Sequence, residues 1–308
     1  MYSRQGPIGV EGGSMPAVNR SPVVYTPSTV SELLELRTRM PQATIWAGGT
    51  ALMSRYYFYP YPLSRDIISL GKVAELSRIT RTERYLDIGS TATIEQILTV
   101  GHHILPPLLA RALRQIGPPT LTSRATIGGN LCIPDLRLNL SASLSLFQVQ
   151  VELRGGKRFG QQSRWIPLNR LYQKEGGLLI QDHEVLTRIR ITFDEGDFQQ
   201  FQQIGFPYRY PEEAVLFSLF ARHSQSSVSD YRLAFTFPRI GIFRDRDIES
   251  AVTNQSLPLM HGDIAEISDL LRRSLHHFSS RIAPIQYARS IRAFERSLTL
   301  LNTRSVSR

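Results

Sequence analysis

Two adjacent glycine pairs constrain this sequence most, because each directly follows a short run of β-prone residues. Gly48-Gly49 ends the run 43–47 (Ala-Thr-Ile-Trp-Ala), and Gly128-Gly129 follows Thr126-Ile127 about 80 residues later. Glycine adopts positive φ angles and lets a ligand approach the backbone closely. Because successive backbone N–H groups at such turns form a concave anion site, the pattern predicts two loops that hold an anionic group such as a pyrophosphate.

Polar residues flank both glycine pairs. Thr50 follows the first pair, and Thr126 and Asn130 enclose the second, so their side chains can add hydrogen bonds to a ligand. Each pair alone is typical of an ordinary turn. Neither matches the Rossmann fingerprint or the Walker A loop, because the glycine spacing of the former motif and the Lys-Ser/Thr of the latter are missing. Only the two pairs together predict a specific site.

The hydrophobic pattern predicts short strands and helices in mixed order, which is typical of an α+β fold. Ser28 is the expected N-cap of the first helix, and the segment 154–158 (Arg-Gly-Gly-Lys-Arg) predicts a hairpin turn. The C-terminal helix shows one apolar face, formed by Ile291, Phe294, Leu298 and Leu301. The expected strands are 23–25, 43–47, 67–70, 85–89, 149–153, 184–191, 215–220 and 231–235, and further helices are expected at 93–98, 108–115 and 285–301.

The length of the chain sets its domain organisation. At 308 residues and 42% hydrophobic content, the chain is expected to fold into two or three domains. Residues 1–20 are expected to form a flexible leader, within which Met15 is an alternative start to Met1. The polar segment 194–197 is the expected boundary, which predicts one domain at 21–195 and a second at 203–302.

Composition excludes several classes of protein. The single cysteine, Cys132, cannot build a disulfide framework or an iron–sulfur cluster from this chain alone. No apolar run approaches the ~18 residues of a membrane span, and the N-terminus lacks the apolar core of a signal peptide, so a cytoplasmic protein is expected. The net charge of +10 comes mostly from scattered arginines, which favours a compositional preference or an acidic protein partner over nucleic-acid binding.

Two histidine pairs, the cysteine and an aromatic run are further candidates. His102-His103 and His276-His277 are adjacent residues whose side chains do not converge on one ion, so no metal site is expected. Cys132 is expected to be a small buried hydrophobe, with a reactive thiol near a cofactor as the alternative. The segment 56–62 (Tyr-Tyr-Phe-Tyr-Pro-Tyr-Pro) is expected to pack in the core or to stack on a cofactor.

Together, the two glycine segments resemble those of a known family. The segments 45–53 (Ile-Trp-Ala-Gly-Gly-Thr-Ala-Leu-Met) and 124–131 (Arg-Ala-Thr-Ile-Gly-Gly-Asn-Leu) look like the loops of the FAD-binding medium subunit of molybdenum hydroxylases. This is the family of the xanthine dehydrogenase and carbon monoxide dehydrogenase flavoprotein subunits. The segments 85–93, 184–191 and 230–235 extend the resemblance to roughly residues 22–302.

The resemblance implies a fold and a set of cofactor contacts. The fold is a two-subdomain FAD-binding domain of the vanillyl-alcohol-oxidase/PCMH type, split near residues 75–80, followed by a smaller α+β C-terminal domain of the CO dehydrogenase flavoprotein type. Backbone amides of both loops would hold the pyrophosphate, and Thr126 would bond a phosphate oxygen or a ribitol hydroxyl. The FAD contacts that the resemblance implies are Ile45, Trp46, Ala47, Gly48, Gly49, Thr50, Ala51, Leu52, Met53, Ile116, Thr126, Ile127, Gly128, Gly129, Asn130, Asn139 and Leu186.

Three positions depart from the family pattern. Ala51 stands where the family usually has an acid or an amide, and Asn139 takes the place of an acid that contacts FAD. Asn139 can keep a hydrogen bond but not the charge. Gly205 stands where some members have a basic residue near the flavin, although Arg209 is close in sequence.

The resemblance also implies a function. A molybdopterin-binding large subunit would hydroxylate the substrate, and electrons would pass through [2Fe-2S] clusters on a small subunit to the FAD of this chain, then to NAD+ or another acceptor. No side chain of this chain is assigned a catalytic role, because electron transfer needs no general acid or base. Two alternatives stay open: a stand-alone flavin oxidoreductase of the same fold, and a scaffold subunit whose FAD site is degenerate at Ala51 and Asn139.

Overall fold

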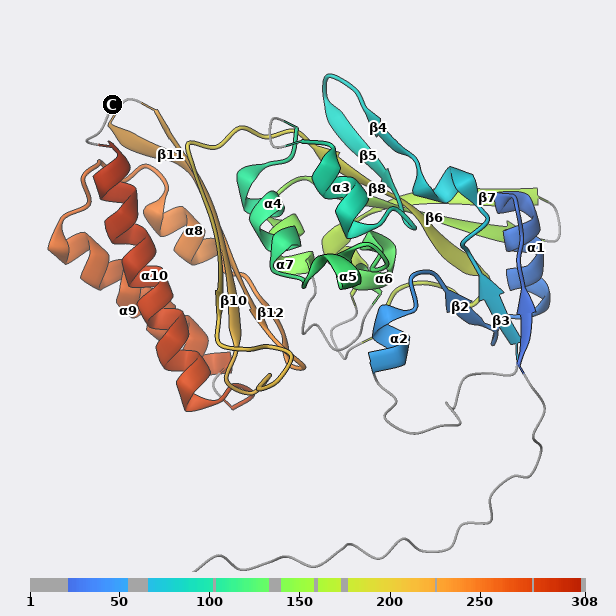
Figure 1. The fold of residues 1–308 in the computed structure, drawn as a ribbon. Coiled ribbons are helices and arrows are strands. Elements are labelled where there is room, and N and C mark those ends of the chain that lie inside the picture. The colour runs from blue at the N-terminus through green and yellow to red at the C-terminus, as the bar shows by residue number, and fades with distance from the viewer. Residues whose placement is uncertain are drawn as a thin grey trace, which may run out of the picture.

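The described residues form three β-sheets with helices packed on them (Figure 1). The computed structural model describes residues 22–54, 66–101, 104–132, 140–157, 160–172, 177–224, 226–278 and 280–305. The predicted leader 1–20, the aromatic run 56–62, His102-His103 and Asn139 lie outside these ranges. The mixture of helices and sheets confirms the predicted α+β fold class.

The first sheet is small and parallel. Its strand order is β1-β3-β2, with β1 at Val23–Tyr25, β3 at Asp66–Ser69 and β2 at Thr44–Trp46. Helix α1 (Val30–Arg39) buries Val30, Leu33 and Leu34, whose spacing places them on one face of the helix. Together with Ile68 and Leu70 they form a separate small core.

The N-cap prediction for α1 is wrong by one residue. Thr29, not Ser28, caps the helix, and its hydroxyl accepts a hydrogen bond from the Glu32 N–H at 3.2 Å. Ser28 instead donates from its N–H and its hydroxyl to the Glu32 carboxylate, at 2.8 and 3.0 Å. Both residues have a side chain suited to capping, so the sequence did not distinguish them.

The second sheet is antiparallel, and helices cover one of its faces. Its order is β4-β5-β8-β6-β7, made by Ile79–Arg81, Tyr85–Gly89, Glu184–Thr192, Val149–Lys157 and Gly160–Pro167. The main core lies between this sheet and the helices, where Leu86 and Ile189 belong to one cluster with Leu108. The helices are α3 (Ile94–Thr99), α4 (Pro107–Arg114), α5 (Pro119–Thr122), α6 (Ile127–Leu131) and α7 (Ser141–Ser145), and short 3-10 turns lie at Ala74–Ser77 and Leu168–Arg170.

The predicted hairpin is confirmed, since β6 and β7 pair antiparallel with Lys157 opposite Gly160, but the strand β6 continues to Lys157 instead of ending before Arg154. Gly155 and Gly156 pair with Gln162 and Gln161 of β7. A Cβ added to Gly156 would lie 2.6 Å from Thr38 Oγ1 and 3.0 Å from the Leu34 carbonyl oxygen of α1. The absence of a side chain at Gly156 therefore lets α1 pack closely on the sheet, and this glycine is not part of a turn.

The third sheet and the last three helices form the C-terminal part. The sheet order is β12-β11-β10-β9, and α8, α9 and α10 cover one face (Figure 1). The predicted apolar face of the C-terminal helix is confirmed, since Ile291, Phe294, Leu298 and Leu301 are all buried. The strands are Phe198–Ile204 (β9), Val215–Ser224 (β10), Ser227–Phe237 (β11) and Gly241–Phe243 (β12), and the helices are Arg246–Val252 (α8), His261–Phe278 (α9) and Pro284–Ser305 (α10).

The opposite face of the third sheet packs on the N-terminal part. Phe220 and Ala234 of this sheet belong to the same core cluster as the residues of α4 and α7. The buried hydroxyls of Ser143 and Ser218 lie 2.9 Å apart across this contact, and the Leu108 N–H donates to Gln199 Oε1 at 3.3 Å. The sheet is thus buried on both faces, which fixes the C-terminal part against the rest of the described chain.

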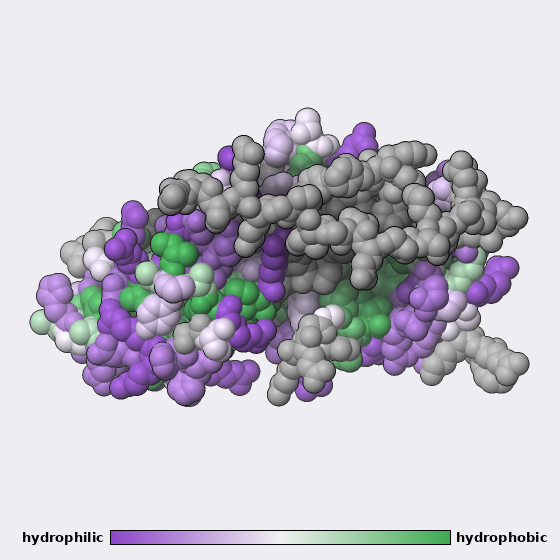
Figure 2. All heavy atoms as spheres, turned by 90° about the horizontal axis from the view of Figure 1, so that it is seen from below, coloured by the Kyte–Doolittle hydropathy of each residue, from purple (hydrophilic) through white to green (hydrophobic). Residues whose placement is uncertain are grey.

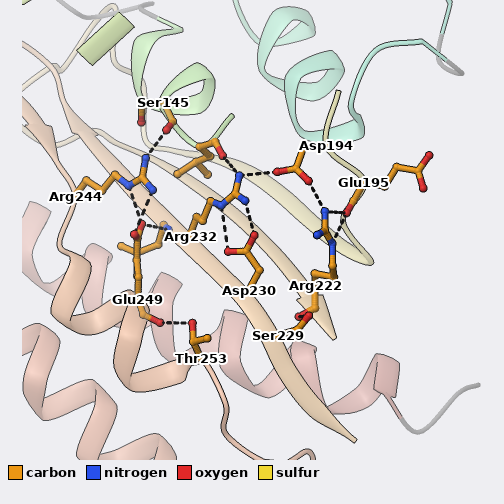
Figure 3. Close-up of polar contacts among 12 residues, drawn as sticks. Ser145, Asp194, Glu195, Arg222, Ser229, Asp230, Arg232, Arg244, Glu249 and Thr253 are labelled. Carbon is orange, nitrogen blue, oxygen red and sulfur yellow. Dashed lines mark hydrogen bonds and ion pairs between the residues drawn. The ribbon is translucent and has the colours of Figure 1, made fainter. Parts of the chain in front are cut away.

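Arg232 of β11 and Arg244, which directly follows β12, hold the C-terminal end of α7 (Figure 3). Arg232 Nη1 donates to the Leu146 carbonyl oxygen at 2.7 Å, and Arg244 Nη1 donates to that of Ser145. The last carbonyls of a helix have no partner within the helix, so these guanidinium groups satisfy them and add a favourable charge at the negative end of the helix. Arg244 is in turn paired with Glu249 of α8 at 2.8 Å.

The same arginine cluster holds the segment that leads into β9. Asp194 accepts from Arg232 Nη1 at 2.7 Å and from Arg222 Nη2. The Glu195 carbonyl oxygen accepts from Arg222 Nε at 2.8 Å. The polar segment 194–197 is therefore bound to the C-terminal sheet through the Asp194 carboxylate and the Glu195 carbonyl oxygen.

None of the described helices combines the length and the apolar character that crossing a lipid bilayer requires. Seen from below, hydrophobic residues gather near α2 (Thr50–Ser54) and again over the C-terminal part, with hydrophilic residues beside both groups (Figure 2).

Candidate functional site

A cavity of about 900 Å³ lies where the three sheets approach one another. Its walls come from the first glycine loop, from the second glycine loop with Leu186 of β8, and from the segment 203–209 at the end of β9. Ligand pockets of proteins range from roughly 300 to 1,000 Å³. The cavity is therefore large enough for an extended ligand of the size of a dinucleotide.

The two glycine loops lie against each other at the cavity wall. A Cβ added to Gly48 would lie only 1.8 Å from the carbonyl oxygen of Arg124, which directly precedes the second loop. Gly49 has a φ of +71°, and a Cβ there would lie 2.4 Å from the ring of Trp46. Both glycines are thus required by the backbone, as predicted, because a side chain at either position would separate the loops or strain the turn.

The first loop presents free backbone donors. Helix α2 begins directly after Gly49, and the first N–H groups of a helix have no acceptor within it. Within the part of the chain that the structure describes, the N–H groups of Gly48, Gly49, Thr50 and Ala51 donate to no protein acceptor. These residues line the cavity, so the loop offers consecutive N–H groups of the kind that bind phosphate.

The second loop differs from the predicted nest of backbone amides. It forms the first turn of α6, and the Thr126 hydroxyl caps the helix by accepting from the Gly129 N–H at 3.1 Å. The other amides also have acceptors: the Ile127 N–H donates to the Ala92 carbonyl, that of Gly128 to Ser90 and that of Asn130 to Thr126. What this loop offers a ligand is the hydroxyl hydrogen of Thr126 and a close approach to Gly128 and Gly129.

Asn130 anchors the chain that follows the second loop. Its Oδ1 accepts a hydrogen bond from the Leu140 N–H at 2.8 Å in a buried setting. Asn130 lines the cavity and is 5% exposed. The predicted contact of Asn130 with FAD stays a prediction, but its amide also has this structural role.

The structure brings most of the predicted contact residues to the cavity wall. Of the described candidates, Trp46, Met53 and Ile127 do not line it. Trp46 packs beneath Gly49, Met53 is 37% exposed, and Ile127 is fully buried in the main core. The wall contains Ile45, Ala47, Gly48, Gly49, Thr50, Ala51, Leu52, Ile116, Thr126, Gly128, Gly129, Asn130 and Leu186.

Sequence reasoning missed several wall residues. Ser90 lines the cavity, and its hydroxyl is buried with no hydrogen-bond partner among the described residues. Ser90 follows the buried strand β5, and no motif marks it. Phe206 and Tyr208 are 69% and 53% exposed at the C-terminal rim of the cavity. The aromatic run after Gly205, whose φ is +81°, is the signal that could have indicated this rim.

The charges of the cavity suit an anionic ligand. The described charged residues on its wall are Arg37, Arg209 and Glu184. Glu184 is already neutralised by Arg164, whose Nε and Nη2 both donate to its carboxylate at 2.7 Å. The wall therefore keeps an excess of positive charge, and Arg209 supplies a cation near the position where Gly205 departs from the family pattern.

The pair of Glu184 and Arg164 makes stability depend on pH. Burial raises the pKa of Glu184, but hydrogen bonds from Arg164 and from the Gln181 N–H outweigh burial and hold the pKa below its usual value. Because the folded pKa is lowered, this stabilisation is present above the unfolded pKa and is lost as pH falls through the folded pKa.

We expect Glu184→Gln to reduce the free energy of unfolding by about 1–3 kcal/mol at neutral pH, and the difference from wild type to shrink only as pH falls below the unfolded pKa of about 4.3 and through the lower folded pKa. Thermal melts of wild type and Glu184→Gln at several pH values measure this difference in stability. Glu35→Gln is the control, because the pair of Glu35 with Arg39 is 3.7 Å long and exposed. A difference for Glu184→Gln that does not shrink between pH 7 and about pH 2 would contradict the assignment.

The cysteine and the second histidine pair that the sequence singled out contact other parts of the protein. Cys132 packs partly buried against the main core and lines the cavity, and burial raises the pKa of its thiol to about 12. The ring of His277 hydrogen-bonds the Arg273 carbonyl through Nδ1 at 3.0 Å. Among the described residues, no group of three or more His, Cys, Asp or Glu side chains is arranged to hold a metal ion.

Sequence comparisons identify relatives of this chain. Over residues 17–192 it matches the family described as "FAD binding domain in molybdopterin dehydrogenase". It is 30% identical over 147 residues to aldehyde oxidase 2 of Cavia porcellus, and 23% identical over 185 residues to aldehyde oxidase 1 of Bos taurus. These matches cover 43% and 54% of this chain but only 11% and 13% of the two oxidases, so the chain corresponds to a small part of each relative.

Solved structures share the fold over nearly the whole chain. Carbon monoxide dehydrogenase from Hydrogenophaga pseudoflava has a TM-score of 0.73 at 19% identity, covering 91% of this chain and 96% of that chain. Quinoline 2-oxidoreductase from Pseudomonas putida 86 has a TM-score of 0.76 at 15% identity, covering 93% and 98%. The predicted fold of the CO dehydrogenase flavoprotein type is confirmed.

The walls of the cavity fit FAD. The free N–H groups of the first loop match an extended dinucleotide with a pyrophosphate near its centre. The orphaned Ser90 hydroxyl and the excess positive charge of the wall point to the same kind of ligand. The family match spans more than half of the chain, and the family resemblance inferred from the sequence is confirmed. The chain belongs to the family of FAD-binding domains of molybdopterin dehydrogenases.

Proposed function

We propose that this chain is the electron-transfer flavoprotein subunit of a molybdopterin-dependent hydroxylase, passing electrons from [2Fe-2S] clusters on a partner subunit through FAD to NAD+ or another acceptor. The observation that carries the proposal is the row of free N–H groups from Gly48 to Ala51 on the wall of a dinucleotide-sized cavity. Bound FAD would supply the redox chemistry, and the protein would bind it and orient it.

Several residues of the cavity wall would contact the cofactor directly. The N–H groups of the first loop would bind the pyrophosphate, and the Thr126 hydroxyl would donate to a phosphate oxygen or a ribitol hydroxyl. Ile116 and Leu186, which are 6% and 5% exposed, would supply apolar contact to the ring systems. Ala51 offers its N–H group, so the missing side chain at this position leaves the backbone contact intact.

The proposal requires partner subunits. A chain with one cysteine does not hold a [2Fe-2S] cluster alone, so the clusters would lie on a small subunit and the molybdopterin on a large one. The net charge of +10 favours docking to acidic partner surfaces. We infer that assembly takes place in the cytoplasm, and that residues 21–195 and 203–302 act as the FAD-binding domain and the C-terminal domain.

The test is a visible spectrum of the purified chain between about 350 and 500 nm, with the chromophore released by heat and identified. We expect flavin bands and about one FAD per chain. A colourless protein that takes up no added FAD would contradict the proposal and leave the scaffold alternative.

A tagged chain isolated from its native host tests the partner subunits. We expect it to carry along subunits that contain molybdenum and iron. A flavin-containing chain that is isolated alone and turns over a small substrate would favour the stand-alone oxidoreductase.

A further inference from the structure

One arginine on the cavity wall has an unused donor. Arg37 of α1 lines the cavity, and its Nε is buried with no hydrogen-bond partner among the described residues. Its Nη1 donates to the Ala43 carbonyl oxygen at 3.0 Å, which ties the guanidinium to the start of β2. An unsatisfied buried donor on a cation is unfavourable, so a ligand that accepts from Nε would remove this penalty.

The surroundings of Arg37 favour an anionic or oxygen-rich ligand. Burial lowers the pKa of Arg37, and the exposed Asp182 offsets this only in part. Arginine remains charged in proteins all the same. Arg37 forms no ion pair with any carboxylate of the described residues, so its half-buried, charged guanidinium gains more from an acceptor on a bound ligand than an arginine in an ion pair does.

The position of Arg37 indicates which half of the cofactor it meets. Helix α1 and the third sheet lie on opposite sides of the glycine loops (Figure 1). On the side of α1, the wall residues Leu70 and Val185 are 4% and 5% exposed, whereas the rim at Phe206 is 69% exposed. The redox ring must be reached by an electron acceptor, so it belongs at the exposed rim. The adenylate half then extends past the glycine loops toward Arg37.

We propose that Arg37 is a cofactor-binding residue whose Nε–H donates to an oxygen of the adenylate half of FAD, an inference that rests on the proposed function. Arg37 lies in helix α1, outside both glycine loops. It can contact the cofactor because the packing of α1 places it on the cavity wall. It binds and positions the cofactor and takes no part in electron transfer.

The test compares flavins that carry the adenylate half with one that does not. Dissociation constants for FAD, FMN and ADP are measured by titration of the full chain, freed of flavin, in wild type and in Arg37→Met. We expect the variant to bind FAD and ADP about 10- to 100-fold more weakly and FMN as the wild type does. Arg37→Lys, which keeps the charge but lacks the guanidinium fork, should show an intermediate loss for FAD.

The matched control is Arg39→Met on the same helix, because Arg39 is 69% exposed and pairs with Glu35 rather than lining the cavity. It should leave all three dissociation constants unchanged. Melting curves of the flavin-free variants separate binding from folding. Equal affinity of wild type and Arg37→Met for FAD overturns the inference about Arg37 alone, and so does an equal loss for FAD and FMN. A wild-type chain that binds no FAD overturns the proposed function itself.

Discussion

Gly48→Ala is expected to abolish tight FAD binding, with the affinity falling on the order of 100-fold or more, because two or more charge-assisted hydrogen bonds of the first loop would be lost. The added Cβ would lie 1.8 Å from the carbonyl oxygen and 2.8 Å from the carbonyl carbon of Arg124. Both atoms are backbone, so no side chain can rotate to make room. The two loops would have to separate, which would move the free N–H groups away from the pyrophosphate.

The same substitution is expected to reduce the free energy of unfolding by about 1–3 kcal/mol, as overpacking does in a well-packed site. Flavin titration and thermal melting measure the two effects. The control is Gly262→Ala at the start of α9, where an added Cβ would meet nothing within 4 Å. This control should be neutral or stabilising by about 0.4–1 kcal/mol. Wild-type FAD affinity in Gly48→Ala would show that the loops do not approach each other as described.

Arg232→Met is expected to reduce the free energy of unfolding by about 2–4 kcal/mol, because the partly buried carboxylate of Asp230 loses its arginine and that of Asp194 keeps only Arg222. The guanidinium of Arg232 contacts the carboxylates of Asp194 and Asp230 and the Leu146 carbonyl oxygen. The side chains of Arg232 and Asp194 are only 20% and 17% exposed. The range lies somewhat below that of a fully buried pair, because water reaches part of this cluster.

Urea unfolding of Arg232→Met and of the control Arg39→Met measures this effect. The control breaks an exposed pair and should cost less than about 0.5 kcal/mol. A double-mutant cycle with Asp194→Asn should show a coupling of about 1–3 kcal/mol. If Arg232→Met is no less stable than the control, the arginine cluster does not fix the C-terminal part against the segment before β9.

The elements that the sequence predicted well are those whose pattern is local. The strand 85–89 and the strand 184–191 appear as β5 and β8, paired with each other, because their alternating apolar residues face the main core. The start of α1 was misplaced by one residue because Ser28 and Thr29 have the same capping chemistry. The hairpin of β6 and β7 was predicted, but β6 was expected to end too early, because glycine is typical both of turns and of strands that another backbone approaches closely.

The candidate site likewise contains residues that a local motif predicts and residues that only the packing of the chain brings to the cavity. Residues of the two glycine loops were predictable because a ligand-binding turn needs glycine where the backbone must turn sharply or approach another group closely. Such glycines are recognisable in the sequence without knowledge of the fold. Arg37, Ser90 and the rim at Phe206 belong to three separate segments that carry no motif. They became part of the site only because α1, the end of β5 and the end of β9 pack around one cavity.

The sequence by itself determined the family, the two glycine loops and most of the strands, because these depend on local backbone conformation and on short-range hydrophobic spacing. Only the tertiary structure decided which loop has free donors. The N–H groups of residues 127–130 already donate to oxygens of Ser90, Ala92 and Thr126, so they are not free to donate to a ligand. The first loop keeps its N–H groups free because the segments that pack against it place no hydrogen-bond acceptor on these groups within the described chain. Hydrogen bonds between distant segments are set by packing, which a single sequence does not record.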